Sequence, residues 1–553
     1  MIELAQKRTV VIGLGQSGLA MACWLTLAGS EVWVFDDREQ PPGLDLLHER
    51  APKAQFRRRS LDAELLSEVD GIDLLAWSPG VSIETGGGSA LYAAARSQGI
   101  PVYGELDFFM DAIHALRRAG AHSDVVAITG TNGKTTVTRL CAFLAQAAGI
   151  SAQAVGNIGP SMLDGLMINL AKGDIQIVSL LRQGESAAER VGDVDDDSAA
   201  CLLKNVLPRL WVLELSSFQL AVARPPACRA AVVLNITPDH LDWHESMESY
   251  RTAKLRIYHA ADRRIVNLDD PLVDPETSAI PCTEQSEGLS TASGRRRVVK
   301  PDNANLPVQA ARTGYSLQAP GHAGDFGMAY DGGLAWLAEA VPDEPVGGRR
   351  RKSGTIGFSV NRLMPADALR VQGTHNHSNV LAALALLRAC GVPLRSMLHA
   401  LRDFVADHHR CEPIAVIGGV EYIDDSKGTN VGATAAALQG MGRRSVLIAG
   451  GVGKGQDFSP LAPVVAAHAR AVVLIGRDAP LLRQAFRDTG LPVKEAVDMV
   501  SAVHEAAHFA QSGDVVLLSP ACASFDMFRS YAHRGEVFAE AVRRMGEEAG
   551  QPC

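Results

Sequence analysis

The sequence lacks the features that would place the chain in a membrane or in an oxidising compartment. No apolar run reaches the roughly 18 uninterrupted residues that a transmembrane helix needs, because the best candidate, LAPVVAAHARAVVLIG, is broken by His468 and Arg470. The apolar run near the N-terminus is too short for a signal peptide. The nine cysteines include no C-x-x-C pair and lie mostly in apolar or helical stretches. These absences predict reduced thiols in a cytoplasmic protein without a membrane span.

The sequence also lacks an excess of positive charge. It contains 53 basic and 62 acidic residues, which gives a formal net charge of -9. Such a chain offers no broad electrostatic surface for a nucleic-acid backbone or an anionic membrane. We therefore expect no nucleic-acid partner, and any polyanion must bind locally.

Length and composition indicate a multidomain globular enzyme. A chain of 553 residues is too long for one hydrophobic core and suggests three or four domains. The 47% hydrophobic and 21% charged residues are typical of soluble folded proteins. No internal short-period repeat is present.

Three α/β units follow one another along the chain. Short β-rich runs such as TVVIG, DVVAITG and SVLIAGG alternate with helical, often Ala-rich stretches, the pattern of parallel α/β units. We place the domains at residues 1–115, 116–406 and 407–553. An ATPase-like sheet is expected in the central domain.

Two stretches are interpreted as surface insertions in the central domain, near residues 172–207 and 282–352. The first carries an acidic run at 193–197, and the second is rich in Gly, Pro, Ser and Arg, with basic runs at 295–297 and 349–352. Solvated surface tracts are a better interpretation of these runs than docking sites.

The first glycine loop, Gly13 to Gly18, follows an expected strand and opens an expected helix. Glycines there let the backbone approach a diphosphate at the helix N-terminus. The next strand ends at Asp36, Asp37 and Arg38, where an acid would accept a ribose hydroxyl. Alone, the loop fits an NAD site or merely a tight strand-to-helix turn.

The second glycine loop predicts a phosphate site more strongly. It comprises Gly130, Thr131, Asn132, Gly133, Lys134, Thr135 and Thr136, between the strand VVAIT and a helix. Backbone N–H groups can surround phosphates, Lys134 can neutralise β/γ oxygens and Thr135 can ligate Mg²⁺. The full Walker A pattern would require glycine at 128, where the chain has isoleucine.

Two further strand ends supply metal-binding chemistry. Glu214 ends the strand WVLE, and Asp239 and His240 follow the strand VVLNI. Each residue taken singly is unremarkable, but together with Lys134 they predict an ATP-Mg²⁺ site at one edge of a sheet.

Taken together, the motifs GTNGKTT, ELSSFQL, NITPDHLDWH, YRTAKLRIY, GTHNHSN, HHR and DDSKGTN occur in the order of the Mur ligases. The chain resembles this family over nearly its whole length, apart from the two insertions and the last residues. The resemblance implies a Rossmann-like N-terminal domain, a central P-loop-type ATPase α/β domain and a C-terminal Rossmann-like α/β domain. Within the family, DDSKGTN and SPACASFDMF resemble members that add D-glutamate.

The resemblance replaces the NAD interpretation of the first loop with a UDP-sugar site. It implies that the UDP sugar contacts residues around the first loop and one residue of the central domain: Gln16, Ser17, Asp36, Asp37, Arg38, Gly80 and Asn157. Asp37 departs from the small hydroxyl residue expected there.

For ATP, the resemblance implies that residues 130–136 bind the phosphates. Asn379 and His409 would flank the adenine, while Arg410 and Asp425 would contact the phosphates and ribose. Two Mg²⁺ ions would be held by Thr135, Glu214, His240 and Lys254, with Lys254 carbamylated, because an ammonium group cannot ligate a cation. The catalytic set would be Lys134, Glu214, His240 and Lys254.

D-glutamate would be received by Lys427, Thr429, Lys454, Ser524 and Tyr531, since a dianionic amino acid needs cations and hydroxyl donors. Tyr531 stands where phenylalanine is expected, and Cys411 where an aromatic residue is usual.

The reaction implied is ATP-dependent addition of D-glutamate to UDP-N-acetylmuramoyl-L-alanine through an acyl phosphate, by a cytoplasmic monomer. An NAD-dependent oxidoreductase is one rival, but it leaves the second glycine loop unexplained. A non-enzymatic nucleotide-binding scaffold is the other, and the lysines at 427 and 454 disfavour it.

Overall fold

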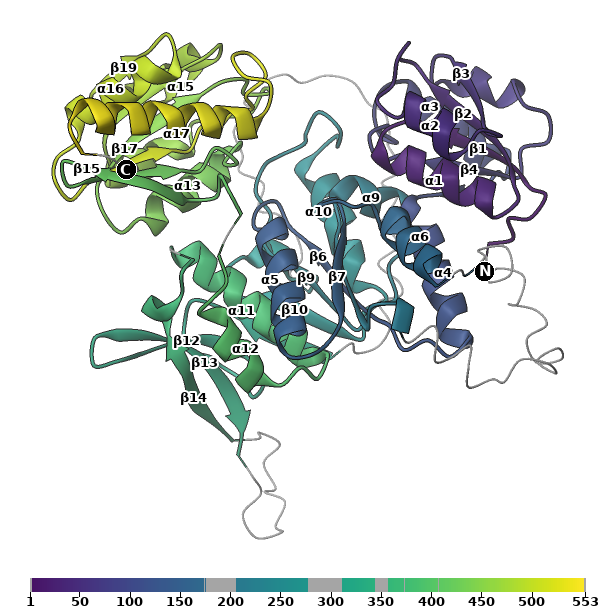
Figure 1. Ribbon diagram of the computed structural model, residues 1–553, viewed down its shortest axis with the longest axis horizontal. Helices are drawn as coiled ribbons and strands as arrows, with labels where there is room; N and C mark the ends of the chain where they lie inside the picture. Colours follow the sequence, from purple (N-terminus) through teal and green to yellow (C-terminus); the bar gives the residue numbers. More distant parts are fainter. Residues whose placement is uncertain are drawn as a thin grey trace, which may run out of the picture.

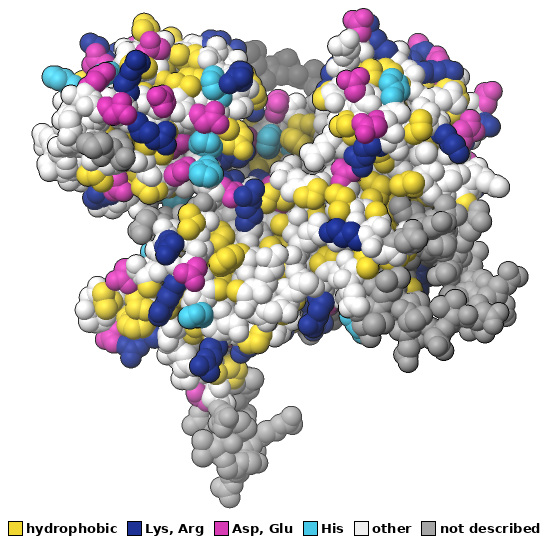
Figure 2. All heavy atoms as spheres, viewed as in Figure 1, with side chains coloured by type: hydrophobic (Ala, Val, Ile, Leu, Met, Phe, Trp, Pro, Cys, Tyr) yellow, Lys and Arg dark blue, Asp and Glu magenta, His cyan; other side chains and the backbone are white. Residues whose placement is uncertain are grey.

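The computed structural model describes residues 2–173, 175, 205–276, 311–343, 357–371, 373–405 and 407–551. These residues form three sheets in three α/β lobes. The lobe at the N-terminal end and the lobe at the C-terminal end lie on either side above the central one (Figure 1), and a notch separates these two lobes in the space-filling view (Figure 2). Three α/β domains are thus confirmed, while the domain boundaries stay a prediction; the helix α4 (Glu105–Arg118) spans the one placed at 115.

The N-terminal sheet is parallel, with strand order β3-β2-β1-β4-β5. The order reverses direction between β1 and β4, which opens a crevice at the carboxyl ends of the strands. Ile12 pairs with both Phe35 and Trp77, so three strands end level at that crevice. The elements are β1 (Arg8–Ile12), α1 (Gln16–Leu27), β2 (Glu31–Asp36), α2 (Leu44–Arg50), β3 (Gln55–Arg58), β4 (Leu74–Trp77), α3 (Gly86–Ser97) and β5 (Val102–Tyr103).

The central sheet has nine strands in the order β14-β13-β12-β11-β10-β9-β6-β8-β7. β6 lies between β8 and β9 in parallel register, with Ile128 opposite Glu214 and Thr129 opposite Val233. The segments after these three strands therefore leave the sheet at one edge. The strands are β6 (Asp124–Thr129), β7 (Ala152–Gly156), β8 (Leu210–Glu214), β9 (Ala230–Val233), β10 (Arg263–Asn267), β11 (Ala311–Tyr315), β12 (Phe326–Asp331), β13 (Leu334–Pro342) and β14 (Phe358–Pro365).

The helices of the central domain surround this sheet. Those among the described residues are α5 (Lys134–Ala147), α6 (Met162–Lys172), α9 (Ser217–Val222), α10 (Met247–Leu255), α11 (Thr374–Ala389) and α12 (Leu394–Leu401). α11 is apolar along most of its length and is buried against β9 to β12 and α5. It anchors Asn379 beside the phosphate loop.

The structure corrects part of the expectation for residues 282–352. Residues 311–342 are not a surface loop, because they form β11, β12 and β13 and bury Tyr315, Met328 and Leu337 in the core. Gly332 and Gly333, both with positive φ, make the tight turn between β12 and β13. The acidic run at 193–197 and the basic runs at 295–297 and 349–352 lie outside the described residues.

The C-terminal sheet has the order β15-β16-β20-β17-β18-β19, parallel except for the β15–β16 pair. Asp424 and Ile448 both pair with Leu518, so the segments after β16, β17 and β20 begin level. The elements are β15 (Glu412–Ile417), β16 (Val420–Asp424), α13 (Val431–Gly440), β17 (Ser445–Gly450), α14 (Leu461–His468), β18 (Ala469–Ile475), α15 (Ala479–Ala485), β19 (Val493–Glu495), α16 (Met499–Phe509), β20 (Val515–Leu518) and α17 (Tyr531–Glu548).

The cores of the three lobes are connected unequally. One cluster of buried residues runs from the N-terminal sheet through α1, α4 and α6 into the central sheet, and the rings of Phe109 and Trp211 meet edge to face within it at 5.3 Å. The C-terminal sheet has separate clusters on its two faces. Among the described residues, no helix is both long and apolar enough to cross a membrane.

Candidate active site

The phosphate loop, residues 130–136, joins β6 to α5 and folds against the segment after β9. The N–H groups of Thr131 and Asn132 donate to the backbone and side-chain oxygens of Asn235, at 2.9 and 2.8 Å. Gly133 has φ +82°, and a Cβ there would lie 2.6 Å from Asn379 Oδ1. Without that Cβ, the loop leads into the first turn of α5, whose N–H groups favour a bound anion.

Two lysines converge on the carbonyl groups of this loop. Lys134 Nζ donates to the carbonyl oxygens of Gly130 and Thr131, at 2.9 and 2.8 Å, and Lys254 Nζ donates to that of Gly130 at 2.8 Å. Burial lowers the pKa of both side chains, and the charge of Lys134 lowers the pKa of Lys254 further. The charges of Glu214 and Asp239 oppose this lowering at Lys134.

Glu214 is 2% exposed, and only one of its carboxylate oxygens is satisfied. Oε1 accepts a hydrogen bond from Asn157 Nδ2 at 2.9 Å, whereas Oε2 is buried without a partner among the described residues. A buried, unpartnered carboxylate oxygen is costly unless a cation or donor reaches it. Its position therefore fits a bound cation.

His240 lies on the same edge, in the segment after β9. Its backbone is left-handed, with φ +57°, and Asp239 Oδ1 accepts its N–H at 2.9 Å. The ring meets the ring of Phe218 edge to face at 4.8 Å. Burial lowers the pKa of His240, so its imidazole is neutral near pH 7 and can act as a metal ligand.

The four predicted metal-binding residues thus lie on four different segments at one end of the central sheet. Thr135 comes from the first turn of α5, Glu214 from β8, His240 from the segment after β9, and Lys254 from α10. Hydroxyl, carboxylate and imidazole groups are suitable Mg²⁺ or water-mediated ligands, but a protonated lysine is not.

A cavity of about 730 Å³ opens at the crevice of the N-terminal sheet and reaches the end of β7. It is lined by all seven residues predicted for the UDP sugar: Gln16, Ser17, Asp36, Asp37, Arg38, Gly80 and Asn157. A Cβ on Gly18 would collide with the carbonyl oxygen of Gly13, and Gly13 has φ +84°, so the turn favours glycine at both positions. The size and the helix N-terminus suit a nucleotide diphosphate.

Asp36 is buried at the wall of this cavity. Its Oδ2 accepts the N–H of Leu14 at 2.7 Å and is paired with Arg38 Nη2 at 2.7 Å. Burial would raise the pKa of Asp36, but these hydrogen bonds outweigh it and lower the pKa. The carboxylate is therefore charged and braces the glycine loop.

A second cavity, of about 250 Å³, lies between the central and C-terminal domains. Residues predicted for ATP line it from both sides: Asn132, Gly133, Thr136, Asn379, Arg410 and Asp425. Lys427, predicted for the amino acid, lines it as well. Burial raises the pKa of Asp425 to about 7, although Ser519 Oγ donates to its Oδ2 at 2.7 Å.

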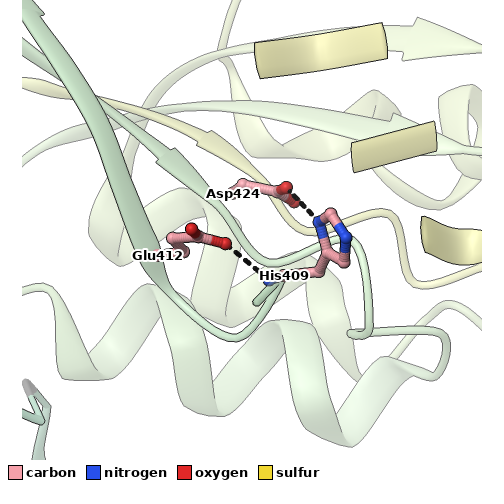
Figure 3. Close-up of side chains that lie close together, drawn as sticks. All are labelled: His409, Glu412 and Asp424. Carbon is pink, nitrogen blue, oxygen red and sulfur yellow. Dashed lines mark hydrogen bonds and ion pairs between the residues drawn. The ribbon is translucent and has the colours of Figure 1, made fainter. Parts of the chain in front are cut away.

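His409 does not line this cavity. It is held instead by Asp424 and Glu412 (Figure 3). Its Nδ1 lies 2.7 Å from Asp424 Oδ2, and its backbone N–H donates to Glu412 Oε2 at 2.8 Å. The possible ligand atoms of these three side chains lie within 4.8 Å of one another. Because Asp424 and Glu412 each already hydrogen-bond His409, we interpret the cluster as a support for the turn at Arg410 rather than a metal site.

The structure brings together some of the residues predicted for D-glutamate. Lys427 Nζ lies 3.6 Å from the ring centroid of Tyr531, and the N–H of Thr429 donates to the carbonyl oxygen of Lys427 at 2.9 Å. Ser524 is buried in the segment after β20. Lys454, with φ +53°, follows β17, and its charge helps to lower the pKa of His240 in the central domain.

Comparison with known proteins covers all three lobes. Family models match residues 7–104 (Mur ligase MurD-like, N-terminal domain), 128–284 (Mur ligase middle domain) and 409–522 (Mur ligase, glutamate ligase domain). A UDP-N-acetylmuramoylalanine--D-glutamate ligase of Burkholderia cenocepacia is 44% identical over 548 residues, covering 98% of this chain and 97% of the relative. The chain belongs to the Mur ligase family.

A relative with the same name from Burkholderia vietnamiensis is 45% identical over 549 residues, with the same coverage. The solved MurF ligase of Thermotoga maritima in complex with ADP matches with a TM-score of 0.50 at 14% identity, covering 99% of this chain and 100% of that one. This likeness shows the shared fold. As a Mur ligase, the chain is an ATP-dependent enzyme that forms amide bonds.

Sequence reasoning missed several residues that hold this Mur ligase site in place. Glu84, in the N-terminal domain, accepts the N–H of Glu245 at 3.0 Å and lies 3.2 Å from Nδ1 of the fully buried His244. The Tyr250 hydroxyl hydrogen-bonds Thr131 Oγ1 at 3.0 Å, and Lys254 Nζ lies over the Tyr250 ring, 4.5 Å from the ring centroid. No local signal marks them, because their partners are distant in sequence.

One missed contact joins the phosphate loop to the C-terminal domain. The side-chain amides of Asn132 and Asn430 bond reciprocally, at 3.3 and 3.1 Å, and Asn430 also caps α13. Asn430 is the last residue of DDSKGTN, so its place in that motif was a usable signal.

Proposed function

We propose that this Mur ligase adds D-glutamate to UDP-N-acetylmuramoyl-L-alanine, with formation of ADP and phosphate, in peptidoglycan precursor synthesis. The match to relatives named for that reaction, which covers 98% of this chain, supports the assignment of these substrates. A cytoplasmic location and a monomeric state remain our predictions, drawn from composition and resemblance.

The observation that carries the proposal is that the two cavities reach the same end of the central sheet, one at Asn157 and the other at the phosphate loop. Asn157 lines the larger cavity and donates to Glu214 at the edge of the sheet, while Asn132 and Gly133 line the smaller one. A UDP-linked carboxylate and an ATP γ-phosphate would therefore meet beside Lys134. The uridine and diphosphate would lie among Gln16, Ser17, Asp36, Asp37, Arg38 and Gly80.

In the first step, a carboxylate oxygen of the alanyl group forms a bond to the γ-phosphorus. The bond from that phosphorus to the β-γ bridging oxygen breaks, and ADP leaves. Lys134 would offset the repulsion between the anions and stabilise the transferring group, aided by the N–H groups of α5. Asn379, Arg410 and Asp425 would orient the nucleotide, and His409 would support the turn that carries Arg410. Activation precedes amide formation because a free carboxylate is a poor electrophile.

In the second step, the amine of D-glutamate attacks the acyl carbon, the carbon–oxygen bond to phosphate breaks, and the amine loses a proton. Lys427 and Lys454 would bind its carboxylates, and Thr429, Ser524 and Tyr531 would complete the subsite. These groups belong to the C-terminal domain and the phosphate loop to the central domain. Closure of the two domains on the substrates would exclude water from the acyl phosphate.

The residues also fit Mg²⁺. Thr135 and Glu214 would hold one ion and His240 and Lys254 a second, where bound Mg²⁺ would supply charge neutralisation to the phosphates. The free Oε2 of Glu214 supports the first assignment. Burial lowers the pKa of Lys254 well below its ordinary value, which favours the neutral amine that CO₂ converts to a carbamate.

The direct test is ADP release by the purified full chain with a panel of substrates. We expect ADP and phosphate only when ATP, UDP-N-acetylmuramoyl-L-alanine and D-glutamate are all present. Equal turnover of UDP-N-acetylmuramate with L-alanine would refute the substrate assignment.

A further inference from the structure

Arg534 is a fully buried arginine in the first turns of α17, and it lies outside every predicted site. It is 0% exposed and is the largest charged side chain among the fully buried residues described. All three of its donor groups are used: Nε donates to Ser426 Oγ at 2.9 Å, Nη1 to the carbonyl oxygen of Cys522 at 3.0 Å, and Nη2 to that of Ser426 at 2.8 Å. Each acceptor is uncharged.

The guanidinium therefore ties together three segments that are far apart in sequence. Ser426 belongs to the segment after β16, Cys522 to the segment after β20, and Arg534 to α17. Ser426 Oγ also donates to the carbonyl oxygen of Tyr531 at 2.7 Å, at the start of α17. One hydroxyl and one guanidinium thus fix the mutual position of all three segments.

These segments carry most of the residues proposed to bind the amino acid. Lys427 follows Ser426 directly, Ser524 lies two residues beyond Cys522, and Tyr531 is the residue whose carbonyl group Ser426 holds. The ammonium group of Lys427 already rests on the Tyr531 ring at 3.6 Å. A shift of any segment would change the distance between these side chains.

Keeping a buried cation without a contacting acid is costly, so stability alone is a weak explanation for it. Within the part of the chain that the structure describes, no carboxylate lies within ion-pair distance of Arg534. Asp424, Asp425 and Asp526 act on its charge only from further away. Burial lowers the pKa of Arg534 to about 10, which still leaves it protonated, with all its donors, at neutral pH.

We infer that Arg534 is a positioning residue for the amino-acid subsite: its guanidinium sets the spacing of Lys427, Ser524 and Tyr531, and thereby the affinity for D-glutamate. This inference rests on the proposed function. The ATP side of the same loop is anchored independently, because the N–H of Asp425 donates to the carbonyl oxygen of Leu518 at 2.8 Å and its carboxylate accepts from Ser519.

The test compares Arg534→Met and Arg534→Lys with the wild-type chain in steady-state kinetics and thermal melting. Neither variant can donate in three fixed directions, so we expect the KM for D-glutamate to rise about tenfold or more in both. The KM values for ATP and the UDP substrate should change less than about threefold, since their anchors remain. Ser426→Ala, which removes only the bridging hydroxyl, should raise the KM for D-glutamate by about threefold.

The matched control is Arg470→Met, in the same domain. Arg470 forms a two-donor pair with Asp514 at the surface, with its side chain 32% exposed, and it touches none of the three segments. It should leave the KM for D-glutamate unchanged.

A purely structural role predicts a different pattern, in which the variants lower the melting temperature and the amount of active enzyme but keep the KM for D-glutamate. That result, or equal rises in all three KM values, would overturn the inference. Failure of the Met variant to fold leaves Arg534→Lys and Ser426→Ala to decide in the same way. Absence of D-glutamate-dependent ADP release in the wild-type chain would instead refute the proposed function itself.

Discussion

Lys254 lies in surroundings that disfavour its charged form. It is 1% exposed, donates to one carbonyl oxygen and lies above one aromatic ring, with Lys134 bonded to the same carbonyl group. Burial first, and then the charge of Lys134, lowers its pKa. A second ammonium is therefore disfavoured here, whereas a carbamate would convert the repulsion into attraction.

Replacement of Lys254 by Ala should lower activity about a hundredfold or more, because it would remove the oxygen ligands that the proposed carbamate would supply. Short carboxylates such as acetate or formate should restore part of the loss. In CO₂-depleted buffer the wild-type enzyme should lose activity and regain it with bicarbonate. The loss should be greater at lower pH, where the amine is protonated.

Lys494→Ala is the control, since Lys494 has a side chain 55% exposed in the C-terminal domain. Full activity of Lys254→Ala, or a lack of any carboxylate or bicarbonate effect, would rule out the carbamate.

At this scale, the sequence predicts residues that belong to local motifs and misses those whose partners are remote. Lys134 and Glu214 follow from a strand-loop-helix motif and a strand end. Arg534 depends on Ser426, 108 positions away, and His244 on Glu84, 160 positions away. Only the folded chain brings such pairs together.

The elements that build the site are the segments leaving the carboxyl ends of parallel strands. β6, β8 and β9 end level, so the phosphate loop, Glu214 and His240 share one edge. This arrangement could be predicted from the strand pattern, because parallel strands deliver their following segments to the same side. β11 to β13 could not, because glycines and polar residues in the surrounding stretch resemble a loop.

Gly133→Ala should disrupt the phosphate loop at this edge of the central sheet. The new Cβ would press on Asn379 Oδ1, at 2.6 Å, and would strain a backbone with φ +82°. We expect kcat/KM for ATP to fall about a hundredfold, as measured by ADP release.

Gly149→Ala is a matched control at the other end of α5. It has φ +79°, but no atom lies within 4 Å of the added Cβ, so it carries the backbone strain without the collision. The prediction fails if both variants lose the same activity, since backbone strain alone would then account for the result.

At the scale of the whole molecule, the N-terminal and central domains share one apolar core, while the C-terminal domain has its own. The described contacts between the central and C-terminal domains include the polar pair Asn132–Asn430. We therefore expect two unfolding transitions in calorimetry of the full chain, one for the shared core and one for the C-terminal domain. The sequence predicted three domains, but not which two of them share a core.

Phe109→Ala and Phe538→Ala separate the two transitions. Both rings are fully buried, the first in the shared core and the second in a C-terminal cluster. Each truncation should destabilise its own unit by about 3–5 kcal/mol and lower only that transition. A single transition that both variants lower equally would show that the three domains unfold as one.

The central claim is that the substrate carboxylate is activated by phosphoryl transfer and then captured by D-glutamate. The most direct measurement uses UDP-N-acetylmuramoyl-L-alanine with ¹⁸O in both oxygens of its terminal carboxylate, and mass spectrometry of the phosphate released in one turnover. The account predicts one ¹⁸O atom in each phosphate and one remaining in the new amide. Unlabelled phosphate, with both labels kept in the substrate carboxylate, would contradict it.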